Sequence, residues 1–342
     1  MTRKATTLAL KFTFLLSILW LPTCLLSQQS SGIRPPALGY IFDSGSRNLK
    51  PILGVPGASI IGAPVNINLE FAHAVASPRQ DYAILLAGPN HDVNLLPFLG
   101  SDSRARLIDG AVPGPDHIAF SPLGSTVLLY RATDSLFQII TGLPASPVIA
   151  HEIRSSSPGG DLKSMAVLDD GQAVLASITN NGVGRLVLIA SDGIPRQVSV
   201  SGVVSAIAFR PQTHDEAVIS NSDRQILLVS NLTRNLRLQI LAASYDGISA
   251  TAAAFSSDGS KVFVANSDTG NLVALDLSGA PPIRIPCQCT PAGLYRMAGN
   301  AVFRLTDASE RPIQVFDGDA AVPRVVFVPL ESQPLSSQRG DQ

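Results

Sequence analysis

The sequence has few charged residues, few aromatic residues and a single tryptophan, and these shortages narrow its possible functions. Charged residues make up 15% of the 342 residues, whereas 45% are hydrophobic. This balance excludes a disordered chain, which needs low hydrophobicity and high charge. The formal net charge of −1 provides no basic field, so we expect no nucleic-acid partner. Beyond residue 27 no apolar run is long enough to span a bilayer, so we expect no transmembrane segment in the mature chain.

The first 27 residues have the pattern of a secretory signal peptide. Arg3, Lys4 and Lys11 precede an apolar run at residues 12–21, and small or polar residues follow it. As a helix, such a run covers only about half of a bilayer core. We expect cleavage after Ser27 and a secreted or periplasmic protein. An uncleaved membrane anchor and a lipoprotein attached through Cys24 are the alternatives.

The rest of the sequence repeats one module with a period near 45 residues. The clearest copy, at residues 251–279, has an apolar run ending at Phe255, an Asp-Gly turn, and further apolar runs at residues 262–264 and 272–275. The alanines in the equivalent position are Ala74, Ala119, Ala166, Ala208 and Ala254. One further copy begins near Arg296, and a shorter module occupies residues 38–65.

Several strand-length runs in each module, without helical periodicity, predict an all-β fold of the β-propeller type. Each blade of a propeller buries both faces against its neighbours, which explains the long apolar strands. Six full modules and one short module predict seven blades of four antiparallel strands, within a single domain at residues 32–329. We expect the short module to share a blade with C-terminal strands such as residues 324–328. Six blades with an irregular N-terminal cover is the alternative, and we expect residues 330–342 to be a disordered polar tail.

The module at residues 254–277 resembles the YVTN family of β-propeller repeats, which are related in shape to WD40 domains. The matching segments are Phe-Ser-Ser-Asp-Gly at residues 255–259, Phe-Val-Ala-Asn at residues 263–266, Gly270 and Leu-Asp-Leu at residues 275–277. The Trp-Asp signature of WD40 repeats is missing. The resemblance implies a secreted bacterial scaffold for binding, although a fold by itself does not assign a function. We therefore predict a non-enzymatic scaffold that binds a protein or a cell-envelope component and needs no cofactor.

The sequence also offers one group of residues for catalysis. None of the five histidines belongs to an HExxH motif, and GxSxG and Walker A motifs are missing. His73, Asp116 and His117 lie at predicted strand starts, where innermost strands could bring them together in the central funnel. These three residues support the alternative function, a metal-dependent propeller hydrolase or lyase. The sequence favours a protein that is not an enzyme but does not decide the question.

Cys287 and Cys289 are the most specific local feature, because they are the cysteines that remain after the signal peptide is removed. On a regular strand their side chains would share one face, with Cα atoms roughly 6.5–7 Å apart. That spacing is at the long limit for a disulfide, which a bend in the chain could shorten. We favour a disulfide; a free dithiol and half of a metal site are the alternatives.

Overall fold

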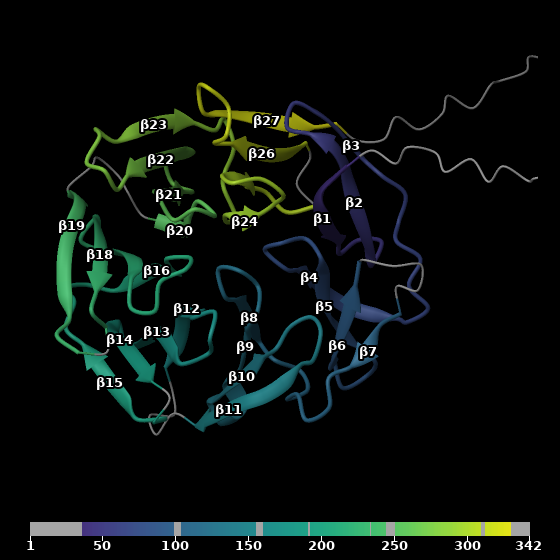
Figure 1. Cartoon of the computed structure of the whole chain (residues 1–342), viewed down its shortest axis with the longest axis horizontal. Helices are drawn as coiled ribbons and strands as arrows, with labels where there is room; N and C mark the ends of the chain where they lie inside the picture. The colour runs from purple at the N-terminus through teal and green to yellow at the C-terminus, as the bar shows by residue number, and fades with distance from the viewer. Residues whose placement is uncertain are drawn as a thin grey trace, which may run out of the picture. The chain divides into compact units, whose positions relative to one another are not determined.

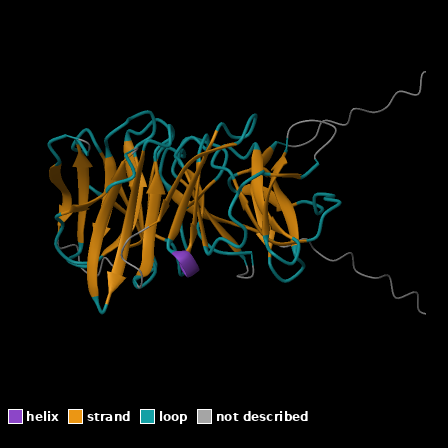
Figure 2. Cartoon of the chain, turned by 90° about the horizontal axis from the view of Figure 1, so that it is seen from below, coloured by secondary structure: helices purple, strands orange, loops and turns teal. Residues whose placement is uncertain are grey.

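The computed structural model describes residues 36–98, 104–154, 160–190, 192–232, 234–243, 250–308 and 312–329. The predicted signal peptide and the predicted polar tail lie outside these residues. The described residues form seven antiparallel sheets, which stand as blades around a common axis (Figure 1). Seen from the side, the strands run from one rim of the ring to the other, and a single 3₁₀ turn, Ala132–Asp134, is the one helical element of the described part (Figure 2).

Six blades contain four strands each, hydrogen-bonded in chain order from the axis outwards. Blade I contains three strands, β1 (Ala37–Asp43), β2 (Asn48–Val55) and β3 (Ala58–Ile61). The strands of blades II to IV are β4 (Phe71–Ala76), β5 (Tyr82–Ala87), β6 (Asp92–Pro97), β7 (Arg106–Leu107), β8 (His117–Phe120), β9 (Val127–Arg131), β10 (Leu136–Thr141), β11 (Val148–Arg154), β12 (Asp161–Val167), β13 (Ala173–Asn180), β14 (Val183–Ala190) and β15 (Pro195–Val198). The strands of blades V to VII are β16 (Val204–Phe209), β17 (Ala217–Asn221), β18 (Gln225–Ser230), β19 (Arg237–Ala243), β20 (Ala250–Phe255), β21 (Lys261–Asn266), β22 (Asn271–Asp276), β23 (Ile283–Pro286), β24 (Tyr295–Arg296), β25 (Val302–Arg304), β26 (Ile313–Asp317) and β27 (Arg324–Val328).

The prediction of a seven-bladed propeller is confirmed, but the predicted closure of the ring is wrong. The short N-terminal module forms its own blade and does not share a sheet with residues 324–328. Instead, β27 pairs with β26 across a short hairpin, from Ile313 opposite Val328 to Asp317 opposite Arg324. This hairpin is a local contact, so it forms at a lower entropic cost than pairing with strands some 270 residues away in the sequence.

The hydrophobic core is divided into seven clusters, one at each interface between neighbouring blades. Strand β5 illustrates the consequence for the sequence, since all six of its residues are buried. One face of this strand packs towards blade I and the other towards blade III. A strand buried on both faces reads as a continuous apolar run, which is why the modules show runs rather than simple alternation.

Polar contacts join the turns that follow the innermost strands, around one rim of the ring. The backbone N–H of Leu123 in blade III donates to the carboxylate of Asp169 in blade IV, at 2.7 Å. Arg210 in blade V donates to the carbonyl of Gly259 in blade VI, at 2.9 Å. In the next pair of turns, Asn300 accepts a hydrogen bond from the N–H of Asp258 at 3.0 Å. These contacts fix the blades relative to one another at the rim.

Gln80 makes the equivalent contacts where the ring closes between blades VII, I and II. Its side-chain amide donates to the carbonyl of Arg296 in blade VII, at 2.7 Å, and to the carbonyl of Ser77 in its own turn, at 2.9 Å. Its side-chain oxygen accepts from the N–H of Tyr40 in blade I, at 2.8 Å. One side chain therefore connects three blades at the point where the two ends of the propeller meet.

Candidate functional site in the central cavity

The candidate site is a cavity of about 590 Å³ on the propeller axis, and every blade contributes to its wall. Most of the wall consists of small and apolar side chains from the innermost strands, including four of the five repeat-marking alanines: Ala74, Ala166, Ala208 and Ala254. These alanines hold equivalent positions on the innermost strands of their blades, so the repeat brings them together in the wall. The cavity surface is therefore suited to packing against an apolar ligand.

Polar and charged side chains gather at one sector of the cavity, from blades II and VII. Arg304, on the second strand of blade VII, lies over the ring of Tyr295 with 4.1 Å between its Cζ atom and the ring centroid. The same guanidinium forms an ion pair with Asp307 at 3.2 Å. A cation that is stacked on a ring and paired with a carboxylate keeps a fixed orientation. This sector gives the otherwise apolar cavity one polar side.

Arg296 also lines the cavity, but its guanidinium is used to join blades VI and VII. It donates to the hydroxyl of Ser257 at 2.7 Å and to the carbonyl of Asn300 at 3.1 Å, and it also contacts the carbonyl of Phe255. Burial lowers the pKa of Arg296 to about 10, which leaves the side chain charged at neutral pH. Arg296 therefore supplies a fixed positive charge beside the cavity.

His73 is the one predicted catalytic residue that lies in the cavity wall. Its ring meets the ring of Phe42 edge to face, with 5.4 Å between centroids. Desolvation lowers the pKa of His73, and the negative charge of Asp307 partly opposes this effect. Burial therefore favours the neutral form of His73, and a neutral imidazole can both donate and accept a hydrogen bond.

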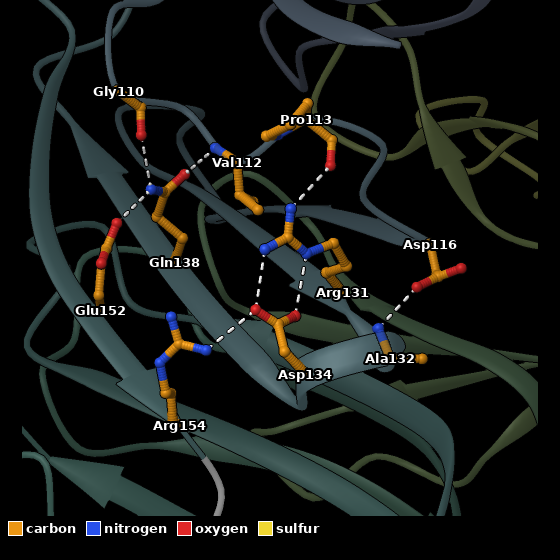
Figure 3. Close-up of polar contacts among 10 residues, drawn as sticks. All are labelled: Gly110, Val112, Pro113, Asp116, Arg131, Ala132, Asp134, Gln138, Glu152 and Arg154. Carbon is orange, nitrogen blue, oxygen red and sulfur yellow. Dashed lines mark hydrogen bonds and ion pairs between the residues drawn. The ribbon is translucent and has the colours of Figure 1, made fainter. Parts of the chain in front are cut away.

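Asp116 and His117 do not join His73 in the cavity wall. Asp116 accepts a hydrogen bond from the N–H of Ala132 at 2.6 Å, and so holds the turn between the second and third strands of blade III (Figure 3). His117 begins β8 and lies beside the ring of Tyr130 on the next strand, 6.1 Å away. Among the described residues no group of three or more His, Cys, Asp or Glu side chains is arranged to hold a metal ion.

The polar residues around Asp116 form a network that supports blade III (Figure 3). Gln138 is almost fully buried; its oxygen accepts from the N–H of Val112 at 2.7 Å, and its nitrogen donates to Gly110 and Glu152 at 2.9 and 2.7 Å. Nearby, two arginines contact Asp134, and hydrogen bonding by Arg131 is the main cause that lowers the pKa of this carboxyl to about 2. These side chains bond to one another and to nearby backbone groups, which indicates a structural role.

Cys287 and Cys289 form a disulfide in the structure, with 5.0 Å between their Cα atoms. The spacing is shorter than on a strand because β23 ends at Pro286 and Gln288 adopts a left-handed backbone with φ of 53°. The bend therefore lies at the residue between the cysteines, in the segment that leads into blade VII.

The charges of the cavity come from Arg296, Arg304 and Asp307, whose role was not predicted from the sequence. The last module matches the repeat only loosely, and its innermost strand, β24, has just two residues. No motif marks these side chains, and their approach to His73 depends on the closure of the ring. The one signal in the sequence is that Arg296 and Arg304 stand at positions where the other modules have apolar residues.

Comparisons with known proteins place the fold but not the family. No family model matches the chain, and no curated protein matches it. A protein of unknown function from Desulfotomaculum acetoxidans is similar in structure, with a TM-score of 0.57 and 11% identity, covering 86% of this chain and 100% of that one. A putative 6-phosphogluconolactonase from Bacteroides uniformis has a TM-score of 0.58 and 13% identity, covering 86% and 96%. Hydrazine synthase from Kuenenia stuttgartiensis has a TM-score of 0.53 and 10% identity, covering 90% and 99%.

These likenesses, together with the seven sheets, define the protein as a seven-bladed β-propeller. At such low identity they establish the architecture alone. Within the described residues, no helix is long and apolar enough to cross a membrane.

Proposed function

We propose that this protein is a non-enzymatic, exported scaffold that binds another protein or a cell-envelope component through its central cavity and the adjoining rim. The observation that carries the proposal is the character of the cavity, whose wall is mainly apolar and whose arginines are engaged in contacts within the propeller. Such a surface can bury an apolar group, and its polar side can orient a ligand. Rigid propellers commonly present binding surfaces of this kind, because loops on a fixed scaffold are free to vary.

Export is the second part of the proposal, and it is supported by the pattern of the first 27 residues. The resemblance of residues 254–277 to YVTN repeats agrees with a bacterial envelope protein. Acidic turns such as residues 169–170 and 215–216 lie on one rim and would disfavour strongly anionic partners. Expression of the full chain in a bacterium, followed by fractionation and mass analysis of its N-terminus, tests this part. We expect a chain in the envelope or the medium that begins at Gln28, and an intact N-terminus in the cytoplasm would contradict it.

Site-directed photocrosslinking tests the binding surface. A photoreactive amino acid replaces Ser44, which is exposed and lines the cavity, and a matched variant carries it at Ser278, an exposed turn residue outside the cavity wall. Illumination in intact cells should give a discrete adduct from position 44 and none from position 278. Equal adducts from both positions, or none from either, would argue against binding at the cavity.

Elemental analysis of the purified protein separates the proposal from the metal-dependent hydrolase. A bound metal stabilises a folded protein, so its removal lowers the melting temperature. The scaffold predicts no stoichiometric metal and a melting temperature that a chelator does not change. Stoichiometric calcium or zinc with a chelator-sensitive melting temperature would instead support the hydrolase or lyase.

A further inference from the structure

Strand β1 runs in the opposite direction to the innermost strands of its two neighbouring blades. Near its start, Leu38 accepts a hydrogen bond at 2.8 Å from the N–H of Ala298, which follows the end of β24. Tyr40 contacts Gln80, which follows the end of β4, whereas Phe42, further along β1, lies beside His73 near the start of β4. The beginning of β1 is therefore at the rim where the neighbouring strands end.

This direction identifies which strand blade I lacks in the described part of the chain. In a four-stranded antiparallel blade, the second and fourth strands run opposite to the first. Strand β1 has the direction of a second strand, and β3 lies at the level of a fourth strand, since it packs against β27, the outermost strand of blade VII. The three strands of blade I thus correspond to the second, third and fourth strands of the other blades. Within the described residues, the innermost position of blade I is therefore open.

The lining of the cavity differs beside this open position. In blades II to VI, only the innermost strands and the turns after them line the cavity. Beside the open position, the wall includes Tyr40 and Phe42 of β1 and also Phe303 and Arg304 of β25, the second strand of blade VII. Tyr40 and Phe42 reach the cavity because no described strand lies in front of β1. Phe303 and Arg304 pair with β24, which has only two residues, and still reach the cavity wall.

The inner edge of β1 also presents backbone groups for pairing. Residues on a strand alternate in the side to which their N–H and C=O groups point. The N–H of Tyr40 points away from β2, because it donates to the side chain of Gln80. Phe42 lies two residues further along a regular stretch of pairing with β2, so its N–H and C=O point to the same inner edge. An edge of this kind can pair with an added strand.

We propose that the central cavity accepts an extended peptide segment of a partner protein, which pairs with the inner edge of β1 as the innermost strand of blade I. This inference rests on the proposed binding function and names its ligand class. The innermost strands of other blades, such as Ala250–Phe255, consist of small and apolar residues. A peptide that takes the innermost position between blades VII and II should therefore have small and apolar residues as well. Arg296 and Arg304 outnumber Asp307 among the charged cavity residues, so a peptide with one carboxylate fits the charge.

A synthetic peptide with the sequence of residues 250–255 followed by one glutamate is the probe, added to the full mature chain. A matched peptide has the same side chains but N-methyl groups at alternate backbone positions, which remove the donors that a strand needs. We expect saturable binding of the first peptide and binding at least about tenfold weaker for the second, as the loss of one or two hydrogen bonds requires. Equal binding of both peptides, or no binding up to about 1 mM, would overturn the proposal.

Two measurements locate the binding at β1. The variant Phe42→Pro removes the N–H at the inner edge, whereas Phe42→Ala removes the ring and keeps that N–H. We expect Phe42→Pro to bind the peptide about tenfold more weakly than Phe42→Ala. In the wild type, hydrogen exchange at the N–H of Phe42 should be fast in the free protein and slow with peptide. Slow exchange in the free protein would mean that another part of this chain covers the edge of β1, and it would overturn the proposal. Adducts at position 44 without peptide binding would leave the scaffold function intact and remove this inference alone.

Discussion

The contacts of Gln80 across the closure of the ring allow a sharp prediction of stability. Replacement by alanine removes three hydrogen bonds, to Tyr40, Arg296 and Ser77, at 2.8, 2.7 and 2.9 Å. At a net value of about 1 kcal/mol for each bond, the free energy of unfolding should fall by about 3 kcal/mol. With an unfolding entropy of about 2.1 cal/mol/K per residue, a propeller of this size should melt about 5 °C lower.

Gln212 provides the matched control for this substitution. It occupies the equivalent turn of blade V and has the same left-handed backbone, with φ of 61° against 59° for Gln80, but its side chain is exposed. Any cost of placing alanine in that conformation is therefore shared by both variants. We expect Gln80→Ala to melt at a clearly lower temperature than Gln212→Ala when thermal unfolding is followed by circular dichroism. Melting temperatures within about 1 °C of each other would refute the role of Gln80 in closing the ring.

Three further predictions concern the polar network, the acid range and the disulfide. Replacing the buried Gln138 by alanine should cost about 3 kcal/mol in chemical denaturation, whereas the exposed Gln197→Ala should change stability by less than about 0.5 kcal/mol. Hydrogen bonding, first by Ser256, lowers the pKa of Asp258 from 3.8 to about 2, so its contribution is complete above about pH 4 and disappears as the pH falls towards 2. The melting temperature of the Asp258→Asn variant should therefore fall less between pH 5 and 2 than that of the wild type, and parallel curves would contradict this assignment. Reduction of the disulfide, which closes a loop of only three residues, should cost about 1.5 kcal/mol. In a chain that begins at Gln28, alkylation with mass analysis should then find two thiols where the unreduced protein gives none.

The sequence alone determined the repeat and the β-propeller class, and it favoured seven blades over six. Alanines spaced by one module recur because each innermost strand has the same place in its blade, so the same local pattern is repeated along the chain. Apolar runs on the inner strands follow from burial on both faces, and turns such as residues 257–259 follow from the backbone freedom of glycine. These features depend on contacts within a module or with an identical neighbour, and such contacts leave a periodic trace in the sequence.

Only the tertiary structure decided how the ring closes and which charges face the cavity. The sequence suggested that residues 38–65 share a blade with residues 324–328, but the local hairpin of β26 and β27 prevails and β1 enters the ring in the reverse direction. The same closure brings Arg304 and Asp307 towards His73, whereas Asp116, adjacent to His117 in the sequence, supports a turn of blade III instead. The closure occurs once and joins the two ends of the propeller, so it has no period in the sequence, and the residues that it brings together carry no shared motif.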